Sequence, residues 1–211
     1  MQLGENPWFL IGLIFLETLL VFIPALISSK IEKKTFKKLL SEMGFQRNEE
    51  IFIKIIAGLS MGILLFFLGN FLILFFRNII VENLFGAGFI EQGQEGAITT
   101  TPIQPDVYQL SILIILQIII IAPCEEAFFR AFIIKKFQVK IKLIYSIIIS
   151  STFFAFYHVP PILVPVTTIV TFFGYYFIIG VILALIFLYF NFSIIPCSVA
   201  HSCFNILVLL I

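Results

Sequence analysis

Long apolar runs, separated by short polar stretches, dominate the sequence. Residues 8–28 and 51–76 are each long enough to cross a bilayer, because a spanning helix needs about 20 apolar residues. Between them, residues 30–50 alternate charged and apolar side chains, which is typical of an amphipathic segment lying in the membrane interface. Gly58 and Gly62 stand at the GxxxG spacing, which indicates either close helix packing or a chance occurrence.

The C-terminal half, residues 107–211, is one apolar block interrupted by prolines, glycines and lysines. A polar, glycine-rich and acidic stretch, residues 78–106, precedes it and is predicted to be the one sizeable extramembrane loop. We predict helices in the block over residues 107–122, 124–138, 142–158, 162–173, 176–189 and 195–211. The pair 162–173 and 176–189 is also compatible with one long helix.

The amino-acid composition indicates that the protein is surrounded by lipid. Hydrophobic residues make up 61% of the 211 residues and charged residues 12%, whereas a soluble domain has about 45–50% and about 25%. The mean hydropathy is +1.13, so much of the surface must face a lipid bilayer. The net charge of +1 gives no reason to expect a nucleic-acid partner. The sequence therefore predicts an all-α, polytopic integral membrane helix bundle, forming a single membrane domain over residues 1–211.

Ionisable side chains inside the apolar block are the candidates for a functional site, because charge within a membrane is costly and is retained mainly for function. Both histidines of the chain belong to this set. Its members, with one buried amide, are Glu125, Glu126, Arg130, His158, His201 and Asn205.

Helical spacing separates the two glutamates. Glu126 and Arg130 are four residues apart and can form an ion pair on one helix face. Glu125 is rotated by about 100° from Glu126, so it faces elsewhere and lacks that partner. We therefore interpret Glu126 and Arg130 as a structural pair and Glu125 as the candidate reactive carboxylate.

A hairpin brings Glu125 and His158 together, because the midpoint between them falls at 141–142, inside a polar turn. His201 lies about 9 Å into the last helix by the rise of 1.5 Å per residue. It meets His158 only if residues 162–189 cross and return as two short helices. This topology predicts about eight membrane helices, some of them short, and a site shallowly below one face.

The charge of the loops indicates which face that is. On this topology the site side carries six Lys and Arg residues within 29–50, and the other side carries Arg77 and the four lysines of 135–142. The positive-inside rule then favours, by one residue, a site facing the cytoplasm. The composition is rich in Ile, Phe and Lys, which is typical of proteins encoded by AT-rich prokaryotic genomes. We therefore expect a multi-pass protein of a prokaryotic cell membrane.

Three motifs resemble those of a known family. Glu125-Glu126-Ala-Phe-Phe-Arg130 resembles its EExxxR motif, Phe154-Ala-Phe-Tyr-His158 its FxxxH, and His201-Ser-Cys-Phe-Asn205 its HxxxN. The family is the CAAX-protease and bacteriocin-processing family (CPBP, or ABI), which includes the type II CAAX prenyl endopeptidases. The resemblance covers about residues 120–211.

The resemblance implies an eight-helix intramembrane endopeptidase with residues 107–211 as its catalytic core. Its substrate would be a prenylated, for example farnesylated, C-terminal peptide, cleaved after the prenylated cysteine to remove three residues. By analogy, Glu125 would activate water with help from His158, and His201 and Asn205 would bind the oxyanion. Glu126, Arg130 and Phe154 would support the site.

Two questions stay open in the sequence. We favour a glutamate-activated water without a metal, but Glu125, His158 and His201 are also a plausible zinc set. The alternative functions are another role of the family, such as bacteriocin processing or self-immunity, and, in a different class, a proton-coupled transporter using Glu125 and His158.

Overall fold

The structure is a computed structural model that describes residues 7–45, 50–98 and 106–211. Within these ranges every regular element is a helix and no strand occurs, as predicted. The N-terminal elements are α1 (Pro7–Ile31), α2 (Phe36–Glu42), α3 (Ile51–Leu74), the π-helical η1 (Phe75–Val81), α4 (Glu82–Phe85) and α5 (Ala87–Glu95). The C-terminal elements are α6 (Val107–Leu116), the π-helical η2 (Gln117–Ile121), α7 (Ala122–Glu126), the π-helical η3 (Ala127–Ile134), α8 (Lys135–Phe137), α9 (Leu143–His158), α10 (Val166–Tyr189) and α11 (Ile194–Leu210).

The helices form a multi-pass membrane bundle. Four stretches are long and apolar enough to cross a bilayer, namely Ile11–Ile31, Ile51–Phe85, Val107–Phe137 and Val166–Tyr189, and α9 and α11 are shorter apolar helices. Large side chains on the outside are strongly exposed, such as Phe52 at 79% and Phe67 at 68%. Such a surface is unfavourable in water and suits contact with lipid. The prediction of a helical membrane bundle is confirmed.

Residues 107–137 form one continuous helix, so the predicted break at Pro123 is wrong. Directly before the proline, η2 widens the helix and Ala122 N–H bonds to Gln117 O. The Ser202 hydroxyl donates to the same oxygen at 2.9 Å. In this π-helical turn each N–H bonds to the carbonyl five residues back instead of four. Pro123 has no N–H to donate, and the helix continues through it because the turn before it already departs from the α-helical bonding pattern.

Residues 166–189 also form one helix, α10, so the predicted division into 162–173 and 176–189 is wrong. Gly174, between the two predicted helices, does not break α10 but allows the Phe76 ring to pack closely against it, since a Cβ there would lie 2.6 Å from that ring.

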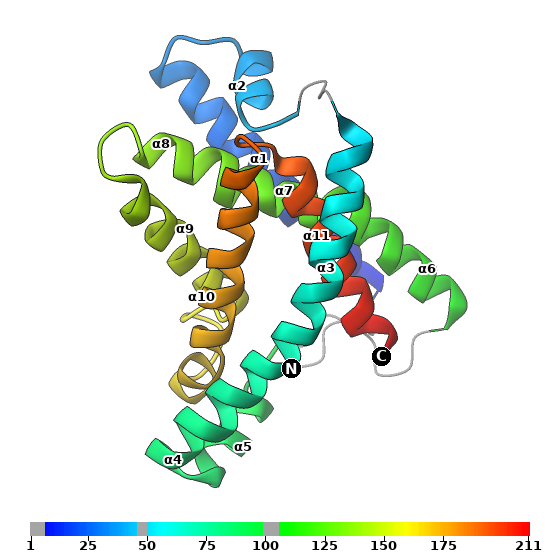
Figure 1. Cartoon of the computed structure of the whole chain (residues 1–211), viewed down its shortest axis with the longest axis vertical. Coiled ribbons are helices and arrows are strands. Elements are labelled where there is room, and N and C mark those ends of the chain that lie inside the picture. The colour runs from blue at the N-terminus through cyan, green and yellow to red at the C-terminus, as the bar shows by residue number, and fades with distance from the viewer. Residues whose placement is uncertain (1–6, 46–49, 99–105) are drawn as a thin grey trace.

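The end of α9 explains how His158 reaches the site without that division. His158, the last residue of α9, packs on Tyr176 with ring centroids 4.6 Å apart. Tyr176 is about ten residues, or about 15 Å, inside α10. α9 therefore ends within the depth of the bundle, and α11 returns from the face where α10 ends (Figure 1).

Two lysine clusters share one face of the bundle, contrary to the topology used for the charge count. Glu32, beyond α1, forms an ion pair with Lys136 of α8, and Lys135 Nζ donates to the Glu42 backbone oxygen at 2.8 Å. The hydrogen bond from Lys136 holds the pKa of Glu32 below its usual range. The α1–α2 turn and the α8–α9 turn therefore lie at the same end (Figure 1). We call this end the lysine-rich face, defined by Lys30, Lys33, Lys34, Lys37, Lys38, Lys135, Lys136, Lys140 and Lys142.

Glycines allow α3 to pack closely on α11. A Cβ on Gly58 would lie 2.7 Å from Val199 Cβ, and one on Gly62 would lie 2.5 Å from Cys203 Cβ. The GxxxG spacing is therefore a packing motif here. The segment predicted as a loop is also partly helical: α5 packs on α10, where Thr168 Oγ1 donates to Gly93 O at 2.7 Å.

Candidate active site

Three helices bring Glu125, His158 and His201 to one point. Glu125 lies on α7, His158 at the end of α9 and His201 in the second turn of α11. Glu125 Oε2 is 3.9 Å from His158 Nε2 and 4.0 Å from His201 Nε2. Glu125 is 3% and His201 2% exposed. His158 is partly exposed, with 22% of its side chain accessible. The structure thus gathers a buried carboxylate, a buried histidine and a partly exposed histidine at one point.

The other ring nitrogen of each histidine faces an oxygen. His201 Nδ1 is 2.9 Å from Glu126 Oε1, and His158 Nδ1 is 3.0 Å from the Phe154 carbonyl oxygen. Because these oxygens accept hydrogen bonds, we assign the ring proton to Nδ1 in both cases. In the neutral ring Nε2 then carries a lone pair, and both lone pairs face Glu125.

Glu126 and Arg130 form the buried pair that the spacing predicted. Arg130 Nε is 3.0 Å from Glu126 Oε2, and both side chains are 0% exposed. The second Glu126 oxygen contacts His201, so one carboxylate joins the arginine of η3 to the histidine of α11. Glu126 therefore faces away from the point where Glu125 meets the histidines.

Phe154 packs against Arg130 and against both histidines. Its ring centroid lies 4.4 Å from the Arg130 guanidinium carbon, 4.4 Å from the His158 ring and 5.8 Å from the His201 ring. An arginine over an aromatic face is attracted to the ring quadrupole. Phe154, which is 1% exposed, thereby links Arg130 to His158 by packing against both.

Asn205 lies one turn beyond His201 but contacts a different partner. Its amide Nδ2 donates to Gln117 Oε1 at 2.9 Å. An amide nitrogen carries two hydrogens, so this bond uses one and fixes the orientation of the group. The hydrogen bond of the Asn205 side chain in the described structure is to Gln117, not to Glu125 or to either histidine.

Three further polar residues around the site escaped the sequence analysis. Gln117 accepts the hydrogen bond from Asn205, and Tyr157 donates to Glu17 Oε1 at 2.6 Å. Glu17, on α1, is 1% exposed. A signal was available for two of them: a carboxylate inside the first apolar run and an amide inside the run 107–122 are both unusual in a membrane helix.

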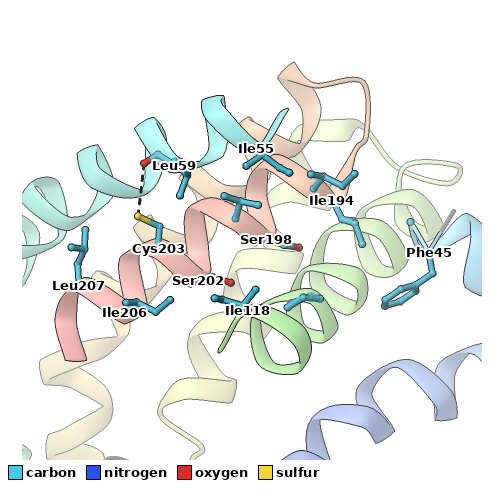
Figure 2. Close-up of a pocket in the computed structure, with 14 residues that line it drawn as sticks. Phe45, Ile55, Leu59, Ile118, Ile194, Ser198, Ser202, Cys203, Ile206 and Leu207 are labelled. Atoms are coloured by element: carbon cyan, nitrogen blue, oxygen red, sulfur yellow. Dashed lines mark hydrogen bonds between the residues drawn. The ribbon is translucent and has the colours of Figure 1, made fainter. Parts of the chain in front are cut away.

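An apolar groove of about 910 Å³ runs along α11 beside the site. Its walls come from α3, α11 and the helix that contains η2 and α7, with Gly44 and Phe45 at one end (Figure 2). Ser198 and Ser202 are its polar lining residues, and Pro123 lies two positions before Glu125. Glu125 and the two histidines do not line the groove. The groove adjoins them, because its lining residues Pro123 and Ser202 are close in sequence to Glu125 and His201.

One small group with positive charge or hydrogens to donate can satisfy all three residues at once. One ligand atom from each of Glu125, His158 and His201 lies within 4.8 Å of the others. A water about 2.8 Å from each atom fits this spacing. Its two hydrogens serve two of the three atoms, so the third residue must carry a proton and donate to the water oxygen. The donor types also fit zinc, and both histidines have the outer hydrogen-bond partner usual for zinc ligands. Zinc bonds of about 2.0–2.2 Å would require the three groups to approach one another by several tenths of an ångström.

Comparison with known proteins agrees with the motifs. Residues 108–207 match the model of the family described as "Type II CAAX prenyl endopeptidase Rce1-like". The resemblance predicted from the three motifs is therefore confirmed for this stretch. No curated protein and no solved structure matches the chain.

Proposed function

We propose that this chain is an intramembrane endopeptidase that removes the C-terminal tripeptide following a prenylated cysteine. The premise is the match of residues 108–207 to the Rce1-like type II CAAX prenyl endopeptidase family. The observation that carries the proposal is the convergence of Glu125 Oε2 with two histidine Nε2 atoms at 3.9 and 4.0 Å. That arrangement holds and deprotonates one water molecule.

In the proposed reaction Glu125 takes a proton from the water while the water oxygen attacks the carbonyl carbon of the prenylated cysteine. His158 Nε2 accepts the second water hydrogen and orients the nucleophile. When the C–N bond breaks, Glu125 returns its proton to the leaving nitrogen. The products are a prenylated cysteine with a free carboxyl group and a tripeptide with a free amino group.

The negative oxygen of the tetrahedral intermediate requires hydrogen-bond donors. Asn205 can supply an amide hydrogen, held in direction by Gln117. His201 can supply a second from Nε2 when its ring is protonated, with Glu126 facing Nδ1. Donors fixed before the reaction lower the barrier most effectively in a site that excludes water.

Zinc is the alternative to a bare water. Glu125, His158 and His201 would hold the ion, which would supply Lewis-acid polarisation and a more acidic bound water. The 3.9–4.0 Å spacing suits a shared water better, so we favour the metal-free reaction.

The groove along α11 fits the prenyl chain. Nine of its fourteen lining residues are aliphatic, and one of them, Pro123, is two residues from Glu125. Such a lining suits a farnesyl chain entering from the lipid, where shape and packing decide the binding, while the peptide reaches Glu125.

The charge of the lysine-rich face supports a cytoplasmic position for that face. Glu125 is about 12 residues from the end of its helix at this face and about 18 from the other end, whereas Tyr176, which packs on His158, is about 13 and about 10 residues from the corresponding ends of α10. The site therefore lies near the middle of the bundle, and the prediction from the sequence of a site shallowly below one face is wrong. The described part of the lysine-rich face carries nine lysines, and the positive-inside rule assigns such a face to the cytoplasm.

Cleavage of a synthetic farnesylated CAAX peptide by the purified protein tests the proposal. We expect release of the intact C-terminal tripeptide and no cleavage of the same peptide without the farnesyl group. Activity that survives complete metal removal, verified by metal analysis, supports the bare water; activity lost with the metal and restored by zinc supports the alternative. Absence of cleavage with any prenylated peptide would contradict the CAAX assignment and favour the immunity or bacteriocin role.

A further inference from the structure

A carboxylate in the middle of α1 has no part in the reaction described above. Glu17 lies near the centre of the 25-residue helix α1 and is 1% exposed. A carboxylate at the centre of a membrane helix is costly, by about 2.5–3.5 kcal/mol on insertion scales. The retention of this group in a helix that could be wholly apolar points to a role.

The partner of Glu17 is adjacent in sequence to a site residue. The Tyr157 hydroxyl donates to Glu17 Oε1 at 2.6 Å, across 140 residues of sequence. Tyr157 directly precedes His158 at the end of α9, and the two rings pack nearly perpendicular at 77° with centroids 5.7 Å apart. The Tyr157 ring also packs on Phe129 at 5.6 Å.

The His158 ring is held on several sides by aromatic rings. Tyr176 of α10 lies 4.6 Å away and Phe154 lies 4.4 Å away, centroid to centroid. Tyr157 supplies the third ring, and it is the one whose hydroxyl is tied to α1. His158 closes α9, and the last turn of a helix frays readily unless other groups hold it.

From these contacts we propose that Glu17 is a positioning residue for the site: by binding the Tyr157 hydroxyl it fixes the last turn of α9 and keeps His158 Nε2 directed at Glu125. The proposal assigns α1 a role in the reaction and rests, for its kinetic consequences, on the proposed peptidase function. Its structural consequence, the orientation of His158, can be measured without any substrate.

The histidine content of the chain makes that measurement simple. The sequence contains two histidines, and both lie at the site. In protein labelled with ¹³C-histidine, each ring gives its own NMR signals, assigned with His158→Gln and His201→Gln variants. Because His201 is held by Glu126 and not by Tyr157, the two signals report separately on the two histidines.

We expect Glu17→Leu and Tyr157→Phe to shift the His158 signal in the same direction and to leave the His201 signal in place. Glu17→Gln keeps an oxygen that accepts the tyrosine hydrogen bond, so the His158 signal should stay near its wild-type position. Thr18→Val is the matched control on the same helix, since the Thr18 hydroxyl donates within α1, to Ile14 O at 2.6 Å. An unchanged His158 signal in both Glu17→Leu and Tyr157→Phe would overturn the proposal. If Glu17→Leu does not fold, Tyr157→Phe, which removes one hydroxyl, decides alone.

Kinetics give the second readout. A misplaced general base or orienting group lowers the rate by about 10-fold to 100-fold, so kcat should fall by that factor in Glu17→Leu while KM stays within about twofold. Glu17→Gln should restore most of kcat. A rise in KM with unchanged kcat would contradict a positioning role. If the wild type cleaves no prenylated peptide, the proposed function fails, and the NMR comparison still decides the role of Glu17.

Discussion

Arg130→Met removes one member of a buried ion pair and leaves the other in place. Arg130 and Glu126 are each 0% exposed and 3.0 Å apart, and the terminal nitrogens of the guanidinium have no hydrogen-bond partner among the described residues. The guanidinium carbon lies over the Phe154 ring, 4.4 Å from its centroid. Removing one partner of such a pair costs about 3–5 kcal/mol, because the other charge stays buried and unpaired.

We therefore expect Arg130→Met to lower the free energy of unfolding by about 3–5 kcal/mol, measured by helix circular dichroism during denaturation in detergent micelles. The double variant Glu126→Leu, Arg130→Met leaves no unpaired charge and should recover most of that loss. Its kcat should nevertheless stay low, because His201 loses the acceptor for Nδ1. Lys136→Met is the control, since it breaks a partly exposed ion pair worth at most about 1 kcal/mol.

Two results would refute this reasoning. Wild-type stability in Arg130→Met would mean that the pair does not neutralise Glu126. Full activity in the double variant would mean that Glu126 has no part in orienting His201. The comparison thus separates the structural from the chemical role of one carboxylate.

The remaining predictions concern helix packing, the oxyanion donor and the groove. Gly62→Val should destabilise the protein by about 1–3 kcal/mol, because even a Cβ would lie 2.5 Å from Cys203 Cβ; unchanged thermal unfolding would contradict close α3–α11 packing. Gln117→Leu removes the acceptor of Asn205 and should lower kcat by up to about 100-fold without raising KM; an unchanged kcat would remove Asn205 from the oxyanion role. Ile206→Trp fills the groove and should raise KM for a farnesylated peptide more than for one carrying the shorter geranyl chain, whereas equal KM changes would move the prenyl chain elsewhere.

The cost of charge in a membrane made the convergence of Glu125, His158 and His201 predictable. Glu125, His158 and His201 stood out because an apolar helix has no structural need for them, and helical spacing alone separated Glu126, with its arginine, from Glu125. The same reasoning applied to the first apolar run would have found Glu17. Its partner Tyr157 could not be found in this way, because a tyrosine in a membrane helix is unremarkable until its hydroxyl has a neighbour.

The topology was harder to predict because it depends on where helices end in three dimensions. Pro123 and Gly174 looked like breaks, but a π-helical turn accommodates the proline and the Phe76 ring occupies the space above the glycine. The end of α9 within the bundle, beside Tyr176, brings His158 to the site without the extra crossing. That crossing was also the reason for placing the two lysine clusters on opposite faces, and its correction brings the clusters to the same face.

The most direct test of the central claim compares wild type with Glu125→Gln in the cleavage of a farnesylated CAAX peptide in H₂¹⁸O, with products analysed by mass spectrometry. Glutamine keeps the size of Glu125 and cannot take a proton from water, and Glu91→Gln, on an exposed carboxylate of α5, is the matched control. We predict that wild type and Glu91→Gln place ¹⁸O in the new carboxyl group of the farnesylated cysteine. Glu125→Gln should retain its fold and lose at least about 100-fold in kcat. Turnover by folded Glu125→Gln at the wild-type rate would contradict the assignment of Glu125 as the base.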